Sequence, residues 1–101
     1  MSHVSGKPYF TYVLWSLVAR RFYIGISDNP EQRLEQHNLG ISRWTARHRP
    51  WTLVYTERFE NYRQARQPEL QLKTQKSGGG FFALTGLDPT RFARSGKSEG
   101  S

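Results

Sequence analysis

Residues 9–26 read YFTYVLWSLVARRFYIGI and predict a β-hairpin. The aromatic and β-branched side chains that favour strands gather in its two halves, residues 9–15 and 21–26. The connection between the halves is short, so the two strands should pair antiparallel. Because alternate side chains of a strand share a face, Tyr12 and Tyr23 can lie side by side on one face of the sheet.

The residues after the hairpin predict a helix that carries residues 31–38. Asp28 or Asn29 can accept hydrogen bonds from the free N–H groups at its start, and Pro30 suits its first position. Gly40 suits its end, because a glycine readily adopts the left-handed conformation that terminates helices.

The rest of the chain predicts one more strand and one more long helix. Residues 42–50 are basic and irregular, and residues 51–59 read as the third strand. The second helix should run over residues 62–76 and stop at the Ser-Gly-Gly-Gly of residues 77–80, with residues 81–84 forming a short closing helix or a docking segment. The order strand, strand, helix, strand, helix predicts an α+β domain with a small, three-stranded, mainly antiparallel sheet flanked by helices.

The length of the chain, 101 residues, fits a single domain. We expect a flexible N-terminus over residues 1–7, the folded domain over residues 8–87 and a disordered tail over residues 88–101, which ends in small and polar side chains. The chain has no cysteine, which excludes disulfides and cysteine–zinc sites.

Charge and hydropathy indicate the partners and the compartment. The net charge is +7, which favours a polyanion, most often nucleic acid. No apolar run approaches the roughly 20 residues that span a bilayer, and the start of the chain lacks the apolar block of a signal peptide. We therefore expect a cytoplasmic protein that does not bind membranes.

One acidic residue stands out in the second predicted helix. Asn61 is placed to cap this helix, and Tyr62, Ala65 and Leu72 share one stripe of its surface. Glu69 lies in the middle of that stripe. A buried carboxylate is costly unless a cation compensates it, so Glu69 either binds a metal ion or pairs with a nearby arginine.

The first predicted helix carries Arg33 and His37 four residues apart, on one face. Leu34 and Ile41 lie beside them and should anchor the helix to the sheet, so Arg33 and His37 should border the sheet. Taken alone, such a pair is usually an ordinary surface pair, and the two tyrosines of the hairpin are usually simple packing partners. Their significance depends on whether they occur together.

These residues together resemble the GIY-YIG nuclease family. Its second motif stands unaltered as Tyr23-Ile24-Gly25, and its first is degenerate, Phe10-Thr11-Tyr12 in place of Gly-Ile-Tyr, with the tyrosine kept. The resemblance covers about residues 8–77. It is strongest to the small stand-alone members related to the excinuclease nuclease domain, which implies a connection with DNA repair.

The spacing of the polar residues matches the same family. Tyr12 and Tyr23 are 11 residues apart, Tyr23 and Arg33 are 10 apart, and Arg33 and His37 are 4 apart. The metal-binding glutamate of the family falls on Glu69. A lone Tyr-Ile-Gly would be weak support, whereas these positions on the expected elements form a specific pattern.

The resemblance implies a metal-dependent endonuclease that hydrolyses phosphodiester bonds in DNA, or in RNA. Glu69 would hold one Mg²⁺ or Mn²⁺, and Arg33 would grip the scissile phosphate. Tyr12 would orient the attacking water or act as the general base, and nearby cations would have to lower its pKa. Tyr23 and His37 would hold or relay the proton, in either order. No small-molecule cofactor is implied.

A basic surface should bind the nucleic-acid backbone. Its candidate residues are Arg43, Trp44, Arg47, His48, Arg49, Lys73 and Lys76. Trp44 can stack on an unpaired base or pack in the core. Since the chain has no room for a separate recognition domain, we expect selectivity for structured or single-stranded substrates.

Two other functions stay open. Pro68 directly precedes Glu69 and can kink the helix, which would leave an inactive nucleic-acid-binding module of the same fold. A protein-interaction domain that meets an acidic partner is the second. Gly25 is expected to keep backbone bulk away from the phosphate.

Overall fold

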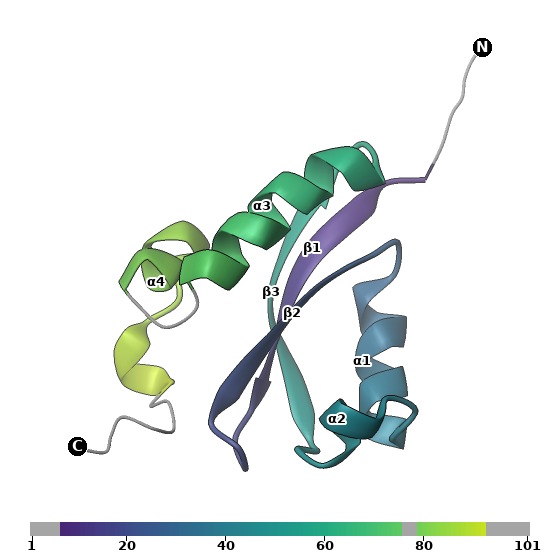
Figure 1. Cartoon of the computed structure of the whole chain (residues 1–101), viewed down its shortest axis with the longest axis vertical. Helices are drawn as coiled ribbons and strands as arrows, with labels where there is room; N and C mark the ends of the chain where they lie inside the picture. The colour runs from purple at the N-terminus through teal and green to yellow at the C-terminus, as the bar shows by residue number, and fades with distance from the viewer. Residues whose placement is uncertain (1–6, 76–78, 93–101) are drawn as a thin grey trace.

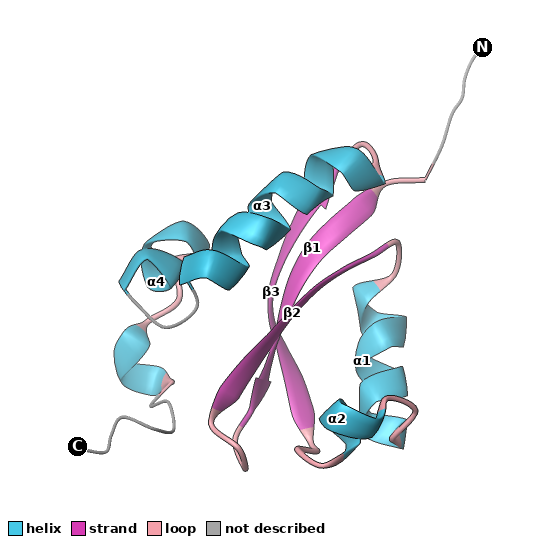
Figure 2. Cartoon of the chain, viewed as in Figure 1, coloured by secondary structure: helices cyan, strands magenta, loops and turns pink. Residues whose placement is uncertain are grey.

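The protein is described by a computed structural model over residues 7–75 and 79–92, and it is built around one antiparallel sheet (Figure 1). The strands are β1 (Tyr9–Ser16), β2 (Arg21–Ser27) and β3 (Trp51–Phe59), in the order β2-β1-β3. Helices cover both faces of this sheet (Figure 2). The predicted α+β class and the three-stranded sheet are confirmed.

The hairpin is the centre of the fold because β1 pairs with both other strands. Residues 11–16 of β1 are all buried, since they are covered on both faces and on both edges. Tyr12 lies opposite Gly25 and Leu14 lies opposite Tyr23. The two tyrosines are therefore diagonal neighbours on one face, as predicted.

One face of the sheet is closed by apolar and aromatic side chains. It is covered by α3 (Tyr62–Gln75) and α4 (Gly79–Thr85), and its buried cluster consists of Val13, Trp15, Phe22, Ile24, Leu72 and Phe81. Burial of large aromatic rings provides most of the stabilisation that such a short chain can obtain.

The chain after α4 also packs on this face. A short 3₁₀ helix (Pro89–Arg91) leads to Phe92, whose ring centroid lies 5.2 Å from that of Trp15 and 5.5 Å from that of Phe22. The packed part of the chain therefore extends to Phe92 rather than ending at residue 87. The rest of the expected tail lies outside the described residues, as do residues 1–6 of the expected flexible N-terminus.

The opposite face is covered by α1 (Pro30–Leu39) and α2 (Arg43–Ala46), which pack on Tyr12, Leu14 and Trp51. The prediction that residues 42–50 are irregular is wrong for the four residues of α2. Leu34 is half-buried and packs on this cluster, as predicted.

The second predicted anchor of α1 is wrong. Ile41 is 71% exposed, because it follows the turn at Gly40, where the backbone takes a φ of +86° and leaves the sheet. Asn38 attaches this end of α1 to the sheet instead. Its amide donates to the Trp51 carbonyl at 3.0 Å and its Oδ1 accepts from the Trp51 N–H.

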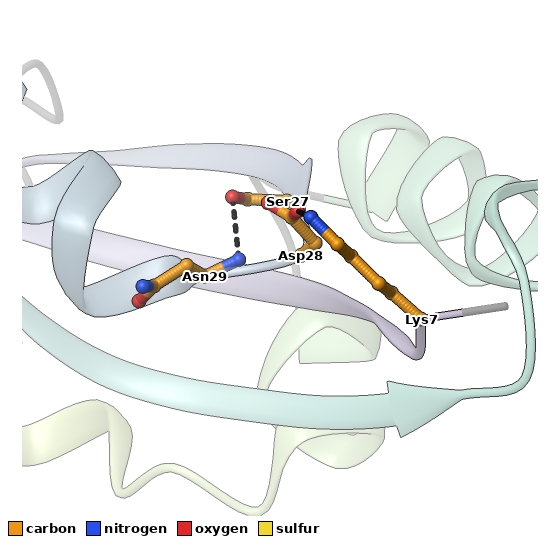
Figure 3. A network of polar contacts seen from close by, with 4 residues as sticks. All are labelled: Lys7, Ser27, Asp28 and Asn29. Atoms are coloured by element: carbon orange, nitrogen blue, oxygen red, sulfur yellow. Dashed lines mark hydrogen bonds and ion pairs between the residues drawn. The ribbon is translucent and has the colours of Figure 1, made fainter.

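The start of α1 follows the predicted capping pattern, and Figure 3 shows the polar contacts of Ser27 with Asn29 and of Lys7 with Asp28 beside it. The Asn29 side chain accepts a hydrogen bond from the Gln32 N–H at 3.1 Å, while the Asn29 N–H donates to Ser27 Oγ at 2.9 Å. Asp28 is not the cap and pairs with Lys7 at 3.3 Å. These contacts fix the direction in which α1 leaves β2.

Helix α3 runs unbroken through Pro68. Its start is capped as predicted, because Asn61 Oδ1 accepts from the Gln64 N–H at 2.9 Å. At its other end, Gly79 begins α4 and does not terminate a helix, while residues 76–78 lie outside the described residues. Residues 81–84 belong to α4, which confirms the closing helix among the two alternatives.

Candidate active site

Two tyrosines lie together on the face that α1 and α2 cover. The ring centroids of Tyr12 and Tyr23 are 6.3 Å apart, and Tyr12 is only 1% exposed. A Cβ atom added at Gly25 would lie 2.6 Å from the Tyr12 hydroxyl. Gly25 is therefore needed to make room for that hydroxyl, which is a more direct constraint than the expected clearance for a phosphate.

His37 connects α1 to this pair of rings. Its Nε2 lies 3.5 Å from the Tyr12 hydroxyl oxygen, and its ring centroid lies 4.7 Å from that of Tyr23. His37 is 2% exposed. Burial lowers the pKa of His37, and the nearby Arg33 charge lowers it further, so the imidazole is neutral at pH 7.

Arg33 lies at the exposed end of the cluster. Its guanidinium is within hydrogen-bonding reach of the hydroxyls of Tyr12 and Tyr23, and it also donates to Gln36 Oε1 at 2.9 Å. The guanidinium is always charged and presents several donors. Because Arg33 is solvent-exposed, it can contact an anion that approaches the tyrosines from outside.

The pKa of Tyr12 moves in the direction opposite to the one that we predicted. Burial raises it above its ordinary value near 10, and this outweighs the lowering effect of the hydrogen bond from Arg33. The charges of Tyr23 and Glu69 raise it further. Tyr12 is therefore a neutral phenol at pH 7 and needs a proton acceptor before it can act as a base.

Glu69 is buried on α3, as its position in the apolar stripe predicts, and is 8% exposed. Its Oε2 lies 2.9 Å from the ammonium of Lys73, one helical turn later. The cation that pairs with Glu69 in the described structure is therefore a lysine. The sequence had offered an arginine or a metal ion as the two alternatives. The stripe contains Ala65 and Leu72, which are buried, whereas Tyr62 is 49% exposed.

The side chains around Glu69 meet the needs of a hard divalent cation only in part. Within residues 7–75 and 79–92, no group of three or more histidine, cysteine, aspartate or glutamate side chains is placed to hold a metal ion. One carboxylate is still a suitable protein ligand for Mg²⁺, which keeps several waters and takes further oxygens from a phosphate. Glu69 fits that description, provided that Lys73 shares or releases the carboxylate.

Trp44 of α2 lies beside Tyr23, and His48 of the following turn lies beside Trp44. Trp44 is 44% exposed, and its ring centroid lies 6.3 Å from that of Tyr23 and 5.9 Å from that of Trp51. It packs on one side and remains accessible on the other, so stacking on an unpaired base stays a prediction. His48 is half-buried beside Trp44, with ring centroids 4.9 Å apart.

The other basic residues predicted to bind nucleic acid differ in exposure and in the contacts that their side chains make. Three arginines are exposed: Arg43, Arg47 and Arg49. Arg49 Nε donates to the Ala46 carbonyl at 2.8 Å, while Lys73 is engaged by Glu69. Lys76 lies outside the described residues.

One residue of the cluster has no counterpart in the sequence-based prediction. Thr45 is fully buried in α2, and its hydroxyl lies 2.9 Å from His37 Nδ1. Nothing in the sequence distinguishes this threonine from the others, because a contact between residues eight apart in different helices leaves no periodic pattern. The contact between Thr45 and His37 arises because α2 packs against α1.

A family model and two known relatives each match most of the chain. The family model described as the GIY-YIG catalytic domain matches residues 8–79. A UPF0213 protein of Enterococcus faecalis (strain ATCC 700802 / V583) is 36% identical over 70 residues, which cover 66% of this chain and 78% of the relative. The "UPF0213 protein in ldhD 5'region" of Pediococcus acidilactici is 35% identical over 78 residues, covering 74% and 79%. No solved structure matches the chain.

Proposed function

The chain belongs to the GIY-YIG family, a nuclease-type family, and we propose that it is a metal-dependent endonuclease that hydrolyses phosphodiester bonds in DNA. The observation that carries this proposal is the convergence of four polar side chains on one face of α1: Tyr12, Tyr23, Arg33 and His37. The charge of Glu69 acts on the same tyrosine hydroxyl. In the described part of the chain, no helix is long and apolar enough to cross a membrane.

Each side chain has a role that suits its chemistry. Arg33 binds the scissile phosphate, since its exposed guanidinium matches phosphate oxygens and stays charged at any working pH. Tyr12 orients and deprotonates the attacking water after giving its own proton to His37 Nε2. Tyr23 packs on the His37 ring and holds it in place. The positive charge that develops on His37 also makes Tyr12 easier to ionise than an isolated buried phenol.

Glu69 is the residue that would hold a single Mg²⁺ or Mn²⁺. When bound, this ion would neutralise charge on the phosphate and stabilise the leaving oxygen. Glu69 is suited to it because it is a buried carboxylate whose described partner is a half-exposed ammonium. Lys73 can swing into solvent when another cation takes its place.

The basic surface around α2 binds the nucleic acid. Arg43, Arg47 and Arg49 contact the backbone, and the exposed side of Trp44 stacks on an unpaired base. The tryptophan lies directly beside the site tyrosine. This adjacency supports selectivity for single-stranded or branched substrates, whose unstacked bases can reach the ring.

A second candidate function is a nucleic-acid-binding module of the same fold without catalytic activity. Two observations favour it: the Lys73 ammonium contacts the carboxylate that a metal would need, and burial holds the Tyr12 pKa high. Pro68 gives it no support, because α3 continues through this residue.

Cleavage of labelled hairpin, flap, branched and single-stranded DNA, and of matching RNA, with Mg²⁺ or Mn²⁺ tests the first candidate. Glu69→Gln should lower the rate about 100-fold or more, as expected for loss of a group that stabilises charge in the transition state. Glu35→Gln, which changes an exposed carboxylate on α1, is the matched control. Equal rates in both variants and the wild type would exclude Glu69 as the metal ligand. Binding without cleavage in the wild type would favour the second candidate.

A further inference from the structure

The polar groups around His37 form a chain that runs from Arg33 through Tyr12, His37 and Thr45 to the Ser42 carbonyl. It begins at Arg33, whose guanidinium has only donors. Because a guanidinium can only donate, any contact of Arg33 with Tyr12 is made to the tyrosine oxygen, which leaves the Tyr12 hydrogen to point elsewhere. His37 Nε2, at 3.5 Å, is a nitrogen that can accept it.

The other end of the chain is fixed by a backbone carbonyl. Thr45 Oγ1 lies 3.3 Å from the Ser42 carbonyl oxygen and 2.9 Å from His37 Nδ1. The Thr45 hydroxyl has one hydrogen and the carbonyl can only accept, so the hydrogen bond to Ser42 uses that hydrogen. The lone pairs of the Thr45 oxygen then face His37, and they require a hydrogen on Nδ1.

From this accounting we propose that Thr45 is a positioning residue, which holds neutral His37 with its hydrogen on Nδ1 and leaves Nε2 free to accept the Tyr12 proton. The opposite tautomer fits the surroundings less well. Nε2–H would point at the Tyr12 oxygen, in competition with the Arg33 guanidinium for the same lone pairs. The hydrogen of the buried Tyr12 would then lose His37 as its acceptor, and an unpaired buried hydroxyl is unfavourable.

The position of Thr45 is fixed by the surrounding structure. Its carbonyl accepts from Trp51 Nε1 at 2.8 Å, and Trp51 is itself joined to Asn38 of α1 by two hydrogen bonds. The Thr45 hydroxyl and the His37 ring are thus held by elements that brace one another. The hydrogen bond at one imidazole nitrogen decides which nitrogen carries the proton, so this geometry selects the tautomer.

The role of Thr45 deepens the proposed function, and its catalytic consequence rests on that function. In the reaction, the Tyr12 O–H bond breaks and the proton moves to His37 Nε2. The products are a phenolate at Tyr12 and an imidazolium at His37, whose Nδ1–H remains bonded to Thr45. The phenolate then takes a proton from the attacking water, and His37 returns its proton to a leaving oxygen or to solvent.

Nitrogen-15 NMR of the histidine rings reads the tautomer directly in the labelled protein, at a pH above the histidine titration. The wild type should show the hydrogen of His37 on Nδ1, with the His37 signals assigned from His37→Gln. Thr45→Val should move the hydrogen mainly to Nε2, which free imidazole side chains prefer. Thr45→Ser keeps the hydroxyl and should restore the wild-type pattern.

Thr11→Val is the matched control. Thr11 is also fully buried, and its hydroxyl donates to the Ala65 carbonyl at 2.8 Å on the other face of the sheet. This variant removes a buried threonine hydroxyl without touching His37, so the tautomer should not change. A wild-type His37 with its hydrogen on Nε2 would overturn the proposal, and this result needs no variant to fold.

A cleavage assay tests the catalytic consequence separately. Thr45→Val should lower kcat about 10-fold to 100-fold, as for other residues that orient a functional histidine, with little change in KM and with recovery in Thr45→Ser. A changed tautomer with unchanged kcat would overturn the role of Thr45 in catalysis. If the wild type cleaves nothing while His37 carries its hydrogen on Nδ1, the proposed function fails and the tautomer assignment stands.

Discussion

The two faces of the sheet are closed in different ways. Under α3 and α4 the contacts are between rings and aliphatic side chains, with Phe22 contacting Trp15, Phe81, Phe82 and Phe92. Under α1 and α2 a smaller apolar cluster is joined by buried contacts through hydroxyl and imidazole groups. Apolar packing supplies free energy without fixing protons, whereas a buried polar chain fixes protons and adds little net free energy.

This difference assigns the faces separate tasks. The apolar face holds the strands together, so the polar face can keep donors and acceptors aimed at Tyr12. Glu69 is the exception on α3, because it is a carboxylate within an otherwise apolar stripe. Its charge still reaches the Tyr12 hydroxyl, so the candidate site draws on both sides of the sheet.

The largest effect should come from the centre of the apolar face. Phe22→Ala removes a fully buried ring, and we expect the free energy of unfolding to fall by about 3–5 kcal/mol. Urea unfolding followed by tryptophan fluorescence measures it. A loss below about 1 kcal/mol would mean that the apolar face is not the main source of stability.

On the face that α1 and α2 cover, a substitution should lower the cleavage rate strongly and the free energy of unfolding only slightly. Tyr12→Phe should lower the cleavage rate about 100-fold or more, because it removes the group that transfers the proton. The free energy of unfolding should change by about 1 kcal/mol, as for one buried hydrogen-bonded hydroxyl. Both quantities should be measured on the same preparation of Tyr12→Phe. A large loss of stability with little loss of cleavage rate would contradict the separate tasks of the two faces.

Gly25 lies where a substitution should disturb the polar face through packing alone. Gly25→Ala places a methyl group 2.6 Å from the Tyr12 hydroxyl, so the tyrosine must move. We expect a loss of about 1–3 kcal/mol of stability, typical of overpacking, together with reduced cleavage. Gly86→Ala is a control for the substitution itself, because the space around Gly86 is open, although its φ of +77° adds backbone strain. Unchanged stability in Gly25→Ala would show that Tyr12 has room to move.

A substitution at Lys73 tests the role of Glu69 with a smaller expected effect. Lys73→Met removes the ammonium that contacts Glu69, so the Mg²⁺ concentration for half-maximal cleavage should fall about two- to five-fold, the range of a weak exposed ion pair. Arg63→Met removes an exposed cation from the first turn of α3 and serves as the control. An increase in the Mg²⁺ requirement would indicate that Lys73 helps to assemble the site.

The smallest expected effect is a pH dependence of stability that comes from His37. Its folded-state pKa lies below its unfolded value of about 6.5, so the unfolded state takes up the proton first. The resulting contribution to stability is complete above that unfolded value and is lost as the pH falls through the folded value. His37→Gln should flatten this part of the curve of unfolding free energy against pH, and an unchanged slope would assign it to other groups.

Local patterns were sufficient for much of the fold. The alternation in residues 9–26, the cap at Asn29 and the turn at Gly40 act through neighbouring residues, and the structure has all three. The adjacency of Tyr12 and Tyr23 follows from the hairpin register in the same way. The burial of Glu69 follows from its place in a helical stripe, since a helix turns one side inward wherever it packs.

Other features required long-range contacts. Ile41 is apolar yet exposed, and Phe92 packs against the core although it lies in a stretch that reads as a tail. The cation beside Glu69 is a lysine because Lys73 lies one turn away on the same helix, whereas composition alone favours an arginine.

The order of the residues was enough to predict the strands, the helix caps, the family pattern and the side chains that gather around Tyr12. The electrostatics of that cluster came from packing alone. The depth at which Tyr12 is buried sets the direction of its pKa, and the docking of α2 on α1 brings Thr45 to His37. Spacing along the chain fixes which side chains can meet. Desolvation and hydrogen-bond direction depend on everything packed around them, and no local pattern encodes that.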